Sequence, residues 1–272
     1  MHGKNVKLFA LFTNLKLALF QRIIFYVCIN QQFTGKKMNT FNEEMRDVSI
    51  SFDLLRNVQN SCVIKFGNTI VICKATIEET VPPFLRKSGM GWVTAEYGML
   101  PGSTSERMRR EAKQISQSGR TQEIQRLIGR SLRVAVDKVA LGERQIIIDC
   151  DVIQADGGTR CASICGGWVA LKLATDALMK SGQIKFDPIV RQVAAVSCGI
   201  VNGEPKLDLN YEEDSSAGTD ANFVMDDKSE LIEIQCSAEK QPFSKKEFEI
   251  MYSLASKGIQ KIIEIQKSAV NE

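Results

Sequence analysis

The sequence contains only one histidine, His2, among its 272 residues. This scarcity excludes a Ser-His-Asp triad, a Cys-His nucleophile pair and a histidine metal cluster in the body of the protein. The eight cysteines form no C-x-x-C motif, and most of them lie inside apolar runs. That pattern indicates reduced, buried thiols in a cytoplasmic protein and argues against disulfides or structural zinc.

Net charge is also small, and its distribution matters more than its total of +3. Six of the 35 Lys and Arg residues lie in residues 1–37, which contain no acidic residue. The rest of the chain therefore carries 29 basic against 32 acidic side chains, a net charge of −3. Because this body has no general attraction for nucleic acid, any RNA binding must come from a local patch.

Residues 1–37 form an apolar segment with flanking lysines that imitates a signal peptide or a membrane helix. Polar residues such as Lys16 and Arg22 interrupt the apolar run, and no small-residue cleavage site is evident. Three interpretations stay open: a start placed too early with Met38 as the true start, a targeting leader, or a loose appendage. We treat this segment as an extension outside the fold and residues 38–272 as one domain.

From Met38 onward, strand-like and helical patterns alternate. Runs rich in β-branched residues predict strands at 48–55, 61–67, 69–78, 92–97 and 145–154. Apolar spacing predicts helices over 121–137, about 160–180 and from the capping box that starts at Ser244 to near the C-terminus. Two hairpins are predicted around Asn202-Gly203 and residues 226–229. With no linker and no fixed repeat, the pattern predicts a single α+β domain.

The stretch ADGGTRCASI, residues 155–164, stands between a predicted strand and a predicted helix. Gly157 and Gly158 allow backbone N–H groups to face outward, and the helix N-terminus adds partial positive charge. Thr159 and Arg160 supply a hydroxyl donor and a guanidinium fork suited to phosphate oxygens. The simpler interpretation is a glycine turn with Thr159 as the helix cap, which local sequence alone favours.

Two other segments fit the same chemistry. In SGRT, Arg120 lies just before a predicted helix, where a cation opposes the helix dipole unless an anion lies between them. In DLNYEEDSSAGTD, Asp214 and Asp220 flank small residues in a predicted loop, a placement compatible with a shared Mg²⁺. Each feature alone also has a simpler explanation without function. Arg120 fits an exposed arginine at a frayed helix end, and the acidic segment fits a polar surface turn.

A basic cluster occupies residues 104–133, with eight Lys and Arg against three Glu. It is the natural place for an RNA backbone in a slightly acidic body, although such clusters are more often solvated faces. Taken together, these signals describe chemistry on a phosphate ester. Inorganic phosphate as the nucleophile needs no strong base, which agrees with the lack of histidine, but it needs donors, a metal and a groove for the RNA chain.

Long motifs in the chain closely resemble the ribonuclease PH family, from about residue 46 to 268. They are VPPFLRKSGMGWVTAEYGMLPGST, SGRTQEIQRLIGRSLR, LGERQIIIDCDVIQADGGTRCASI, AAVSCGIVNGE, DLNYEEDSSAGTDANFVM and EIQCSAE. Members of this family are phosphorolytic 3′-to-5′ exoribonucleases, or tRNA nucleotidyltransferases. They trim tRNA precursors, release nucleoside diphosphates and add nucleotides in the reverse reaction. The resemblance implies this activity here, with rRNA processing as a further role.

The resemblance also implies site residues, a fold and an assembly. Arg120, Gly158, Thr159 and Arg160 match phosphate-binding positions, with Arg120 counted among the catalytic residues. The paired carboxylates Asp214 and Asp220 match positions for catalysis and Mg²⁺, and the arginines after LPGST that match tRNA contacts are Arg107, Arg109 and Arg110. The implied fold is a β-α-β type with a left-handed crossover, against the common right-handed rule. The implied assembly is a homohexamer, a trimer of dimers forming a ring, in the cytoplasm and without a membrane.

The chain departs from the family pattern at several positions. Gly102 stands where an arginine is common, which weakens the predicted tRNA patch, and Gly218 replaces a frequent Glu. Cys236-Ser237 replaces a usual Gly-Thr, and EEMRD near residue 45 is a poor version of a basic N-terminal motif. Because no phosphate or metal residue is lost, we expect activity to survive. The alternatives are a catalytically inactive RNA-binding ring subunit and, less favoured, membrane attachment through residues 1–37.

Overall fold

A computed structural model describes residues 44–52, 58–111 and 116–271 of the chain. The chain divides into two units, Met1–Thr40 and Phe41–Glu272, and the description below concerns the second unit. The prediction that residues 1–37 form an extension lies outside the described residues.

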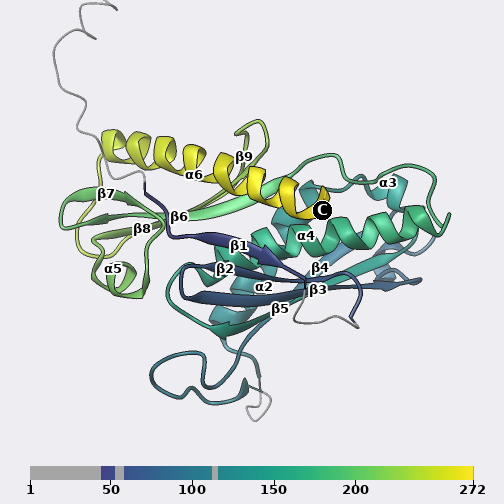
Figure 1. Ribbon diagram of the computed structural model, residues 1–272, viewed down its shortest axis with the longest axis horizontal. Helices are drawn as coiled ribbons and strands as arrows, with labels where there is room; N and C mark the ends of the chain where they lie inside the picture. Colours follow the sequence, from purple (N-terminus) through teal and green to yellow (C-terminus); the bar gives the residue numbers. More distant parts are fainter. Residues whose placement is uncertain (1–43, 53–57, 112–115, 272) are drawn as a thin grey trace, which may run out of the picture. The chain divides into compact units, whose positions relative to one another are not determined.

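The first sheet has the strand order β1-β2-β3-β5-β4 (Figure 1). All its neighbours are antiparallel except the pair of β4 and β5, which is parallel. Alternate residues of the long strands are buried, as expected for a sheet with one covered and one solvent-facing side. The strands are β1 (Val48–Ser51), β2 (Ser61–Phe66), β3 (Thr69–Glu78), β4 (Trp92–Met99) and β5 (Gln145–Gln154).

The chain passes from β4 to β5 through helix α2 (Gly119–Val134) and the short helix α3 (Lys138–Leu141). The apolar residues of α2 lie on one buried face, as the spacing predicts. The helix predicted over 121–137 is α2, which ends at Val134, three residues earlier than predicted. The side chain of Asp137 accepts hydrogen bonds from the backbone of Val139 and Ala140 and so starts the separate helix α3.

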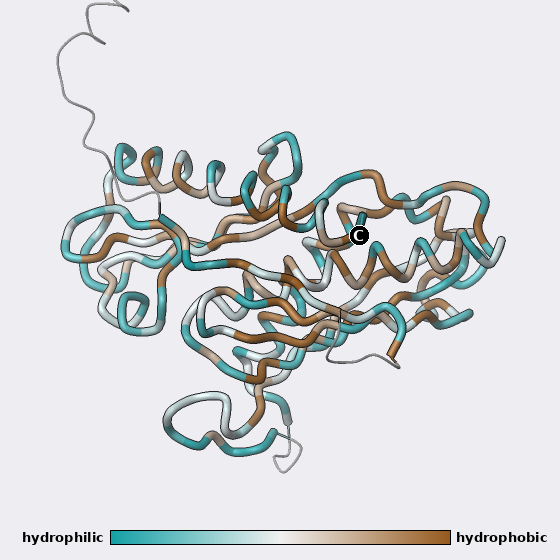
Figure 2. Tube along the Cα trace, in the orientation of Figure 1, coloured by the Kyte–Doolittle hydropathy of each residue, from teal (hydrophilic) through white to brown (hydrophobic). Residues whose placement is uncertain are grey.

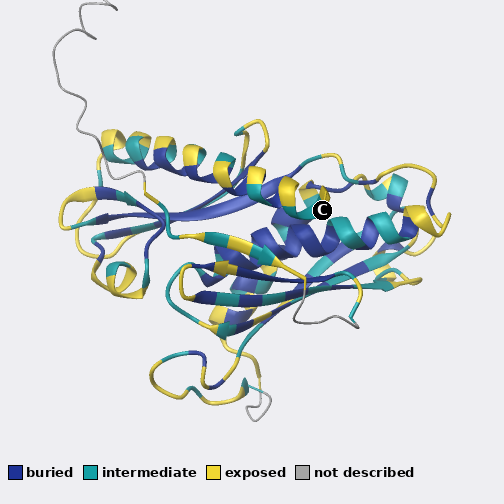
Figure 3. Cartoon of the chain, in the orientation of Figure 1, coloured by how far each residue is buried: buried dark blue, intermediate teal, exposed yellow. Residues whose placement is uncertain are grey.

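Helix α4 (Thr159–Lys180) is the central element of the core. It packs against β3 of the first sheet and β6 of the second, and Figure 3 shows most of its length buried. It is long and apolar enough to cross a membrane, but 78% of that stretch is buried inside the protein. A helix that is apolar on all sides and enclosed between two sheets has the character of a core helix.

The second sheet has the strand order β7-β6-β8-β9 and is antiparallel throughout. Its strands are β6 (Val193–Val201), β7 (Glu204–Leu207), β8 (Thr219–Asp226) and β9 (Leu231–Ala238). Asn202 and Gly203 both have positive φ angles, 52° and 83°, which is the backbone of the predicted tight hairpin between β6 and β7. Hydrophobic residues concentrate along the strands of both sheets, and hydrophilic residues concentrate at their turns (Figure 2).

Helix α6 (Lys245–Asn271) packs against the second sheet with its apolar face. Its predicted capping box is present, because the Ser244 hydroxyl accepts from the Glu247 backbone and the Glu247 carboxylate accepts from the Ser244 backbone. The seven cysteines of the described residues carry no disulfide, and all but the half-buried Cys236 are buried, as the composition indicated.

The segment around the aspartates differs from the prediction. Residues 208–220 were expected to be a loop, but they contain helix α5 (Tyr211–Ser216), with Asp214 in the helix and Asp220 in β8. The physical reason is a second capping box. The Asn210 side chain accepts from the Glu213 backbone, and the Glu213 carboxylate accepts from the Asn210 backbone.

Tight packing around α4 leads to a stability prediction. A Cβ at Gly166 would lie 2.7 Å from the Cys73 Sγ atom and 2.8 Å from a methyl of Ile64. We therefore expect Gly166→Ala to lower the free energy of unfolding by about 1–3 kcal/mol through overpacking, measured by denaturant unfolding. Gly119→Ala is the control, because no heavy atom lies within 4 Å of its added Cβ. Equal effects in both variants would contradict the packing argument.

Candidate active site

The glycine corner lies between β5 and α4 and has the backbone that only glycine adopts readily. Gly157 and Gly158 have φ angles of 72° and 65°, and a Cβ on Gly157 would lie 2.5 Å from the carbonyl oxygen of Leu209. Gly158 is the N-cap residue of α4 and makes no side-chain cap, so the interpretation of Thr159 as the cap is wrong. Gly158 itself thus places no side chain over the first amides of α4, and the guanidinium of Arg46 lies close to it.

Thr159 begins α4 and is 6% exposed. Its hydroxyl is 2.9 Å from the hydroxyl of Tyr97 on β4, which ties the helix start to the parallel strand. The two hydroxyls can exchange donor and acceptor roles, so either one can orient the other.

Arg160, the next residue, is held by two side chains that the sequence did not reveal as partners. Its Nη1 donates to Oε1 of Gln235 on β9 at 3.1 Å, and its Nη2 lies 4.0 Å from a carboxylate oxygen of Glu123 on α2. Gln235 in turn donates to Glu123 at 2.8 Å. Only weak signals in the sequence pointed to these two partners of Arg160. Glu123 lies one helical turn after Arg120 in the SGRTQE stretch, and Gln235 directly precedes Cys236-Ser237.

Arg120 is the second residue of α2, two positions after the N-cap Ser118, and is exposed. Its Nη1 atom lies 3.6 Å from the sulfur of Met99, at the end of β4. Within the described ranges no carboxylate forms an ion pair with Arg120. A cation without a counter-ion at a helix N-terminus adds its charge to that of the dipole, so both attract an anion.

The charges of these arginines act on two aspartates, Asp214 of α5 and Asp220 of β8. Asp214 is exposed on α5, yet surrounding protein atoms desolvate its carboxyl and raise its pKa, while the charges of Arg160 and Arg120 oppose that rise. Asp220 is half-buried at the start of β8. Its pKa is raised by burial, by Asp214 and by Glu239, and Arg160 opposes the rise.

The donor set at the aspartates fits a divalent cation. The Oδ1 atom of Asp220 is buried and has no hydrogen-bond partner, and the neighbouring carboxylate charge of Asp214 raises its pKa. Mg²⁺ takes one or two carboxylates together with waters and substrate phosphates. Two oxygens of this kind beside an anion site therefore suit Mg²⁺, and the described residues contain no group of three or more His, Cys, Asp or Glu that would make a larger cage.

The structure thus brings together most of the residues predicted for the site. Arg120, Thr159 and Arg160 come from two helix N-termini, Asp214 comes from α5, and Asp220 comes from β8 of the second sheet. The charges of both arginines act on the Asp214 carboxyl. An anion held by the arginines would lie within electrostatic reach of a cation held by the aspartates.

The predicted RNA-contacting arginines lie elsewhere, on the segment that follows β4. Arg107, Arg109 and Arg110 are exposed, and this segment extends away from the sheets (Figures 1 and 3). Gly102, in the same segment, lies in open space and would accommodate a side chain. A Cβ at Gly218 would make only an ordinary van der Waals contact with one carbonyl oxygen. The local packing at Gly218 would therefore also accommodate a side chain.

The basic cluster of residues 104–133 is not one solvated face. Arg130 forms an ion pair with Glu233 on β9, with its Nε atom 3.0 Å from the carboxylate. The Arg133 guanidinium lies 4.4 Å from the centre of the Trp92 ring, and burial together with Arg130 lowers its pKa. These two arginines contribute to packing between elements, and Lys113 lies outside the described residues.

Comparison with protein families agrees with this fold and arrangement. Residues 44–175 match domain 1 of the 3′ exoribonuclease family, and residues 191–258 match domain 2. The chain therefore belongs to the 3′ exoribonuclease family.

Among curated proteins, the chain is similar to Ribonuclease PH of several bacteria. It is 58% identical to the protein of Cereibacter sphaeroides over 237 residues, which cover 87% of this chain and 98% of that one. It is 57% identical to the protein of Roseobacter denitrificans over 236 residues, with the same coverage. The identity to the protein of Caulobacter vibrioides is 56% over 228 residues, 84% of this chain and 96% of that one. The predicted family is thereby confirmed.

Solved structures show the same fold at much lower identity. A chain of the Archaeoglobus fulgidus exosome with RNA bound to the active site matches with a TM-score of 0.69 and 18% identity, covering 88% of this chain and 95% of that chain. A chain of an archaeal exosome core matches with a TM-score of 0.64 and 18% identity, covering 92% and 98%. These likenesses confirm the predicted fold class.

The raised pKa of Asp220 leads to a pH-dependent stability prediction. Because its folded-state pKa lies above the usual value, its ionisation costs stability as the pH rises from about 3.9 through the raised value. We expect Asp220→Asn, in metal-free buffer, to raise Tm by about 1–2 °C at pH 7, the small size reflecting solvent screening of a half-exposed group. The gain should disappear near pH 4.

Thermal unfolding followed by circular dichroism measures this effect. Glu212→Gln, an exposed carboxylate on α5, is the matched control and should not raise Tm. A lower Tm for Asp220→Asn at pH 7, or a gain that is the same at both pH values, would contradict the assigned electrostatics.

Proposed function

We propose that this chain is a phosphate-dependent 3′-to-5′ exoribonuclease that trims tRNA precursors and releases nucleoside diphosphates. The observation that carries the proposal is the convergence of Arg120 and Arg160, each in the first turn of a helix, with Asp214 and Asp220. Membership of the 3′ exoribonuclease family and 56–58% identity to Ribonuclease PH proteins support the same reaction. The substrates are RNA 3′ ends and inorganic phosphate.

The helix starts would bind and orient the phosphate. The backbone at Gly158, the Thr159 hydroxyl and the Arg160 guanidinium would approach it from α4, and Arg120 would approach it from α2. An oxygen of the phosphate forms a bond to the phosphorus of the terminal RNA linkage, and the bond from that phosphorus to the preceding 3′ oxygen breaks. The terminal nucleotide leaves as a diphosphate, and the 3′ oxygen of the shortened RNA takes up the proton that the attacking hydrogen phosphate loses.

Electrostatic stabilisation is the main contribution that these side chains make. The guanidinium groups offset the charge that accumulates as two phosphate groups approach each other, and fixed donors do so without reorganisation during the reaction. Asp214 and Asp220 would hold Mg²⁺, which supplies charge neutralisation at the reacting phosphates. Raised carboxyl pKa values in the absence of a cation agree with this role, because a bound cation would favour the ionised forms.

We assign RNA binding to Arg107, Arg109 and Arg110, whose exposed guanidinium groups suit backbone phosphates. We also propose a homohexamer in the cytoplasm, built as a trimer of dimers. The ring-forming exosome relatives that share the fold support an assembly of this kind. Residues 1–37 stay, in this proposal, an extension that is not part of the catalytic unit of residues 38–272.

The alternative function, an inactive RNA-binding ring subunit, is less favoured. Such a subunit has no need of phosphate arginines or metal carboxylates. This chain retains Arg120, Arg160, Asp214 and Asp220 and places them within electrostatic reach of one another.

The decisive test uses a tRNA that carries extra 3′ nucleotides, with and without inorganic phosphate. We expect nucleoside diphosphates to appear only when phosphate is present, and Asp220→Asn to slow their release by about 10²–10³-fold through lost charge stabilisation. Chromatography of the released nucleotides measures both. Release of monophosphates alone would contradict phosphorolysis, and unchanged trimming by Asp220→Asn would favour the inactive-subunit alternative or another catalytic residue.

Arg120→Ala tests the phosphate role separately from RNA binding. Loss of a charge-assisted contact costs about 1.5–3 kcal/mol, so the KM for phosphate should rise by about 10–100-fold. The affinity for RNA should change much less, because the guanidinium addresses the small anion. Arg126→Ala, an exposed arginine on the same helix, is the control for general charge. Equal losses of phosphate and RNA affinity in Arg120→Ala would contradict the assignment.

A further inference from the structure

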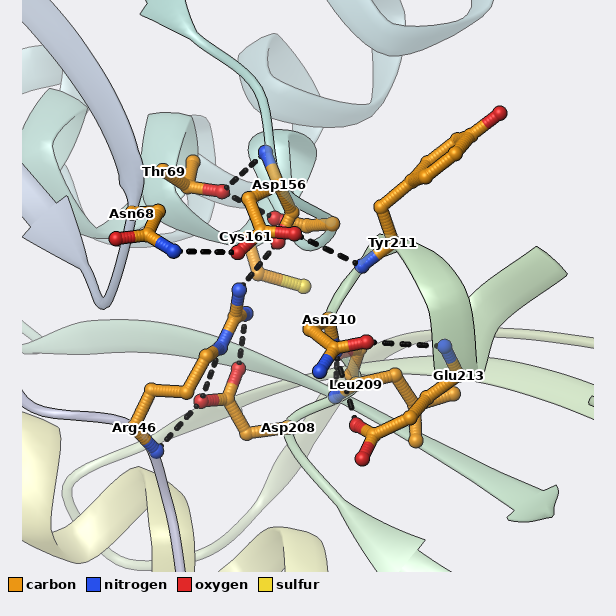
Figure 4. A network of polar contacts seen from close by, with 12 residues as sticks. Arg46, Asn68, Thr69, Asp156, Cys161, Asp208, Leu209, Asn210, Tyr211 and Glu213 are labelled. Carbon is orange, nitrogen blue, oxygen red and sulfur yellow. Dashed lines mark hydrogen bonds and ion pairs between the residues drawn. The ribbon is translucent and has the colours of Figure 1, made fainter. Parts of the chain in front are cut away.

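Arg46 and Asp208 form a buried ion pair beside the glycine corner (Figure 4). The guanidinium donates from Nη2 to Oδ1 of Asp208 at 2.6 Å and from Nε to Oδ2 at 2.9 Å, and the Arg46 backbone N–H donates to Oδ2 at 3.0 Å. The side chain of Asp208 is 1% exposed and that of Arg46 is 16% exposed. This is a bidentate, charge-assisted geometry, the strongest form that such a pair adopts.

The same arginine holds the corner itself. Its Nη1 donates to the backbone oxygen of Asp156, the residue before Gly157. A Cβ on Gly158 would lie 3.0 Å from Nη2 of Arg46 and 3.9 Å from Oδ1 of Asp208, so the corner backbone rests directly on the ion pair. Burial alone lowers the pKa of Arg46, but its hydrogen bond and charge interaction with Asp208 outweigh this and raise it.

Asp156 extends the network to two other elements (Figure 4). Its carboxylate accepts from the Tyr211 backbone N–H, the first residue of α5, at 3.2 Å. It also accepts from Asn68 in the turn between β2 and β3 at 3.2 Å. Thr69 completes the link, because its hydroxyl accepts from the Asp156 N–H at 2.9 Å and donates to the Gly157 carbonyl at 2.6 Å.

The other side of the ion pair sets the position of α5. Asp208 has a positive φ of 56° and is followed at once by the residues that begin α5. The Leu209 N–H donates to the Ser197 hydroxyl of β6 at 3.1 Å. Lys206 of β7 forms an ion pair with Glu213, which is one of the two residues of the capping box. Because α5 is short and capped, the backbone at Asp208 determines where Asp214 lies.

We propose that the Arg46–Asp208 pair is a positioning site that fixes the phosphate-binding corner and the Asp214-bearing helix relative to each other. This inference rests on the proposed function. We assign neither residue a catalytic role, because their charged groups bind each other and the backbone of the protein. Arg46 belongs to the EEMRD segment, which matches the family motif poorly in sequence. The segment nevertheless supplies a residue that contacts both the glycine corner and Asp208.

Asp208→Asn is the test variant, because asparagine has the same shape and tolerates the left-handed backbone. We expect its KM for phosphate to rise by about 10–100-fold, as for other losses of groups that orient a binding residue. The phosphate concentration needed to stabilise the RNA-free protein against heat should rise in parallel, because the stabilisation depends on the ligand concentration relative to its Kd.

Asp226→Asn is the matched control. Asp226 is also fully buried, pairs with Arg191 at 2.8 Å and accepts from the Lys228 and Glu230 backbones, but it lies at the opposite end of β8 from Asp220. We expect it to lower Tm while leaving both phosphate measurements unchanged. If Asp208→Asn lowers Tm with an unchanged KM and an unchanged thermal response to phosphate, the proposal is wrong. Equal changes of KM in both variants would also overturn it.

A second variant covers the case in which Asp208→Asn does not fold. Arg46→Lys keeps the charge beside Asp208 but cannot reach both Asp208 and the Asp156 carbonyl with a fork, so it should show the same rise in KM for phosphate. An unchanged KM would overturn the proposal. A wild-type protein that gains heat stability from phosphate but releases no diphosphates would contradict the proposed function alone, and the thermal response of the variants would still decide the positioning role.

Discussion

The proposed site depends on one electrostatic constraint: an anion would have to be held close to two carboxylates. Burial is the main cause of the raised pKa values of Asp214 and Asp220, and the charge of Asp214 adds to the rise at Asp220. The opposing charge comes from Arg120 and Arg160, each in the first turn of a helix whose N-terminal amides point the same way. Gln235 and Glu123 hold the Arg160 guanidinium in this position.

The fold meets this constraint by bringing helix starts from the first sheet to a strand end of the second. The parallel pair of β4 and β5 directs α2 and α4 toward β8 and β9, and Glu123 of α2 and Gln235 of β9 hold the Arg160 guanidinium. The Arg46–Asp208 pair supports the same corner from the opposite side. Buried ion pairs add little to stability on balance, so their value here is in fixing geometry.

Much of this could be predicted from local patterns. The hairpin at Asn202-Gly203, the strands β3 and β5, the capping box at Ser244 and the start of α4 follow from turn chemistry, alternation and helix signals that act over a few residues. The assignment of Arg120, Arg160, Asp214 and Asp220 needed the family resemblance as well, because each local signal also fits an ordinary surface role. Helix α5 was missed because only its capping geometry separates six polar residues from a loop.

By itself the sequence determined the class of fold, the absence of histidine chemistry and the residue types that can hold phosphate and metal. Only the tertiary structure decided which charges are free and which are used in packing. Arg130 and Arg133 belong to the same basic run as Arg120, but they contact Glu233 and Trp92, while Arg120 keeps no carboxylate partner within the described residues. Partners such as Gln235 for Arg160 and Asp208 for Arg46 are 75 and 162 residues away, and no local periodicity encodes contacts at that separation.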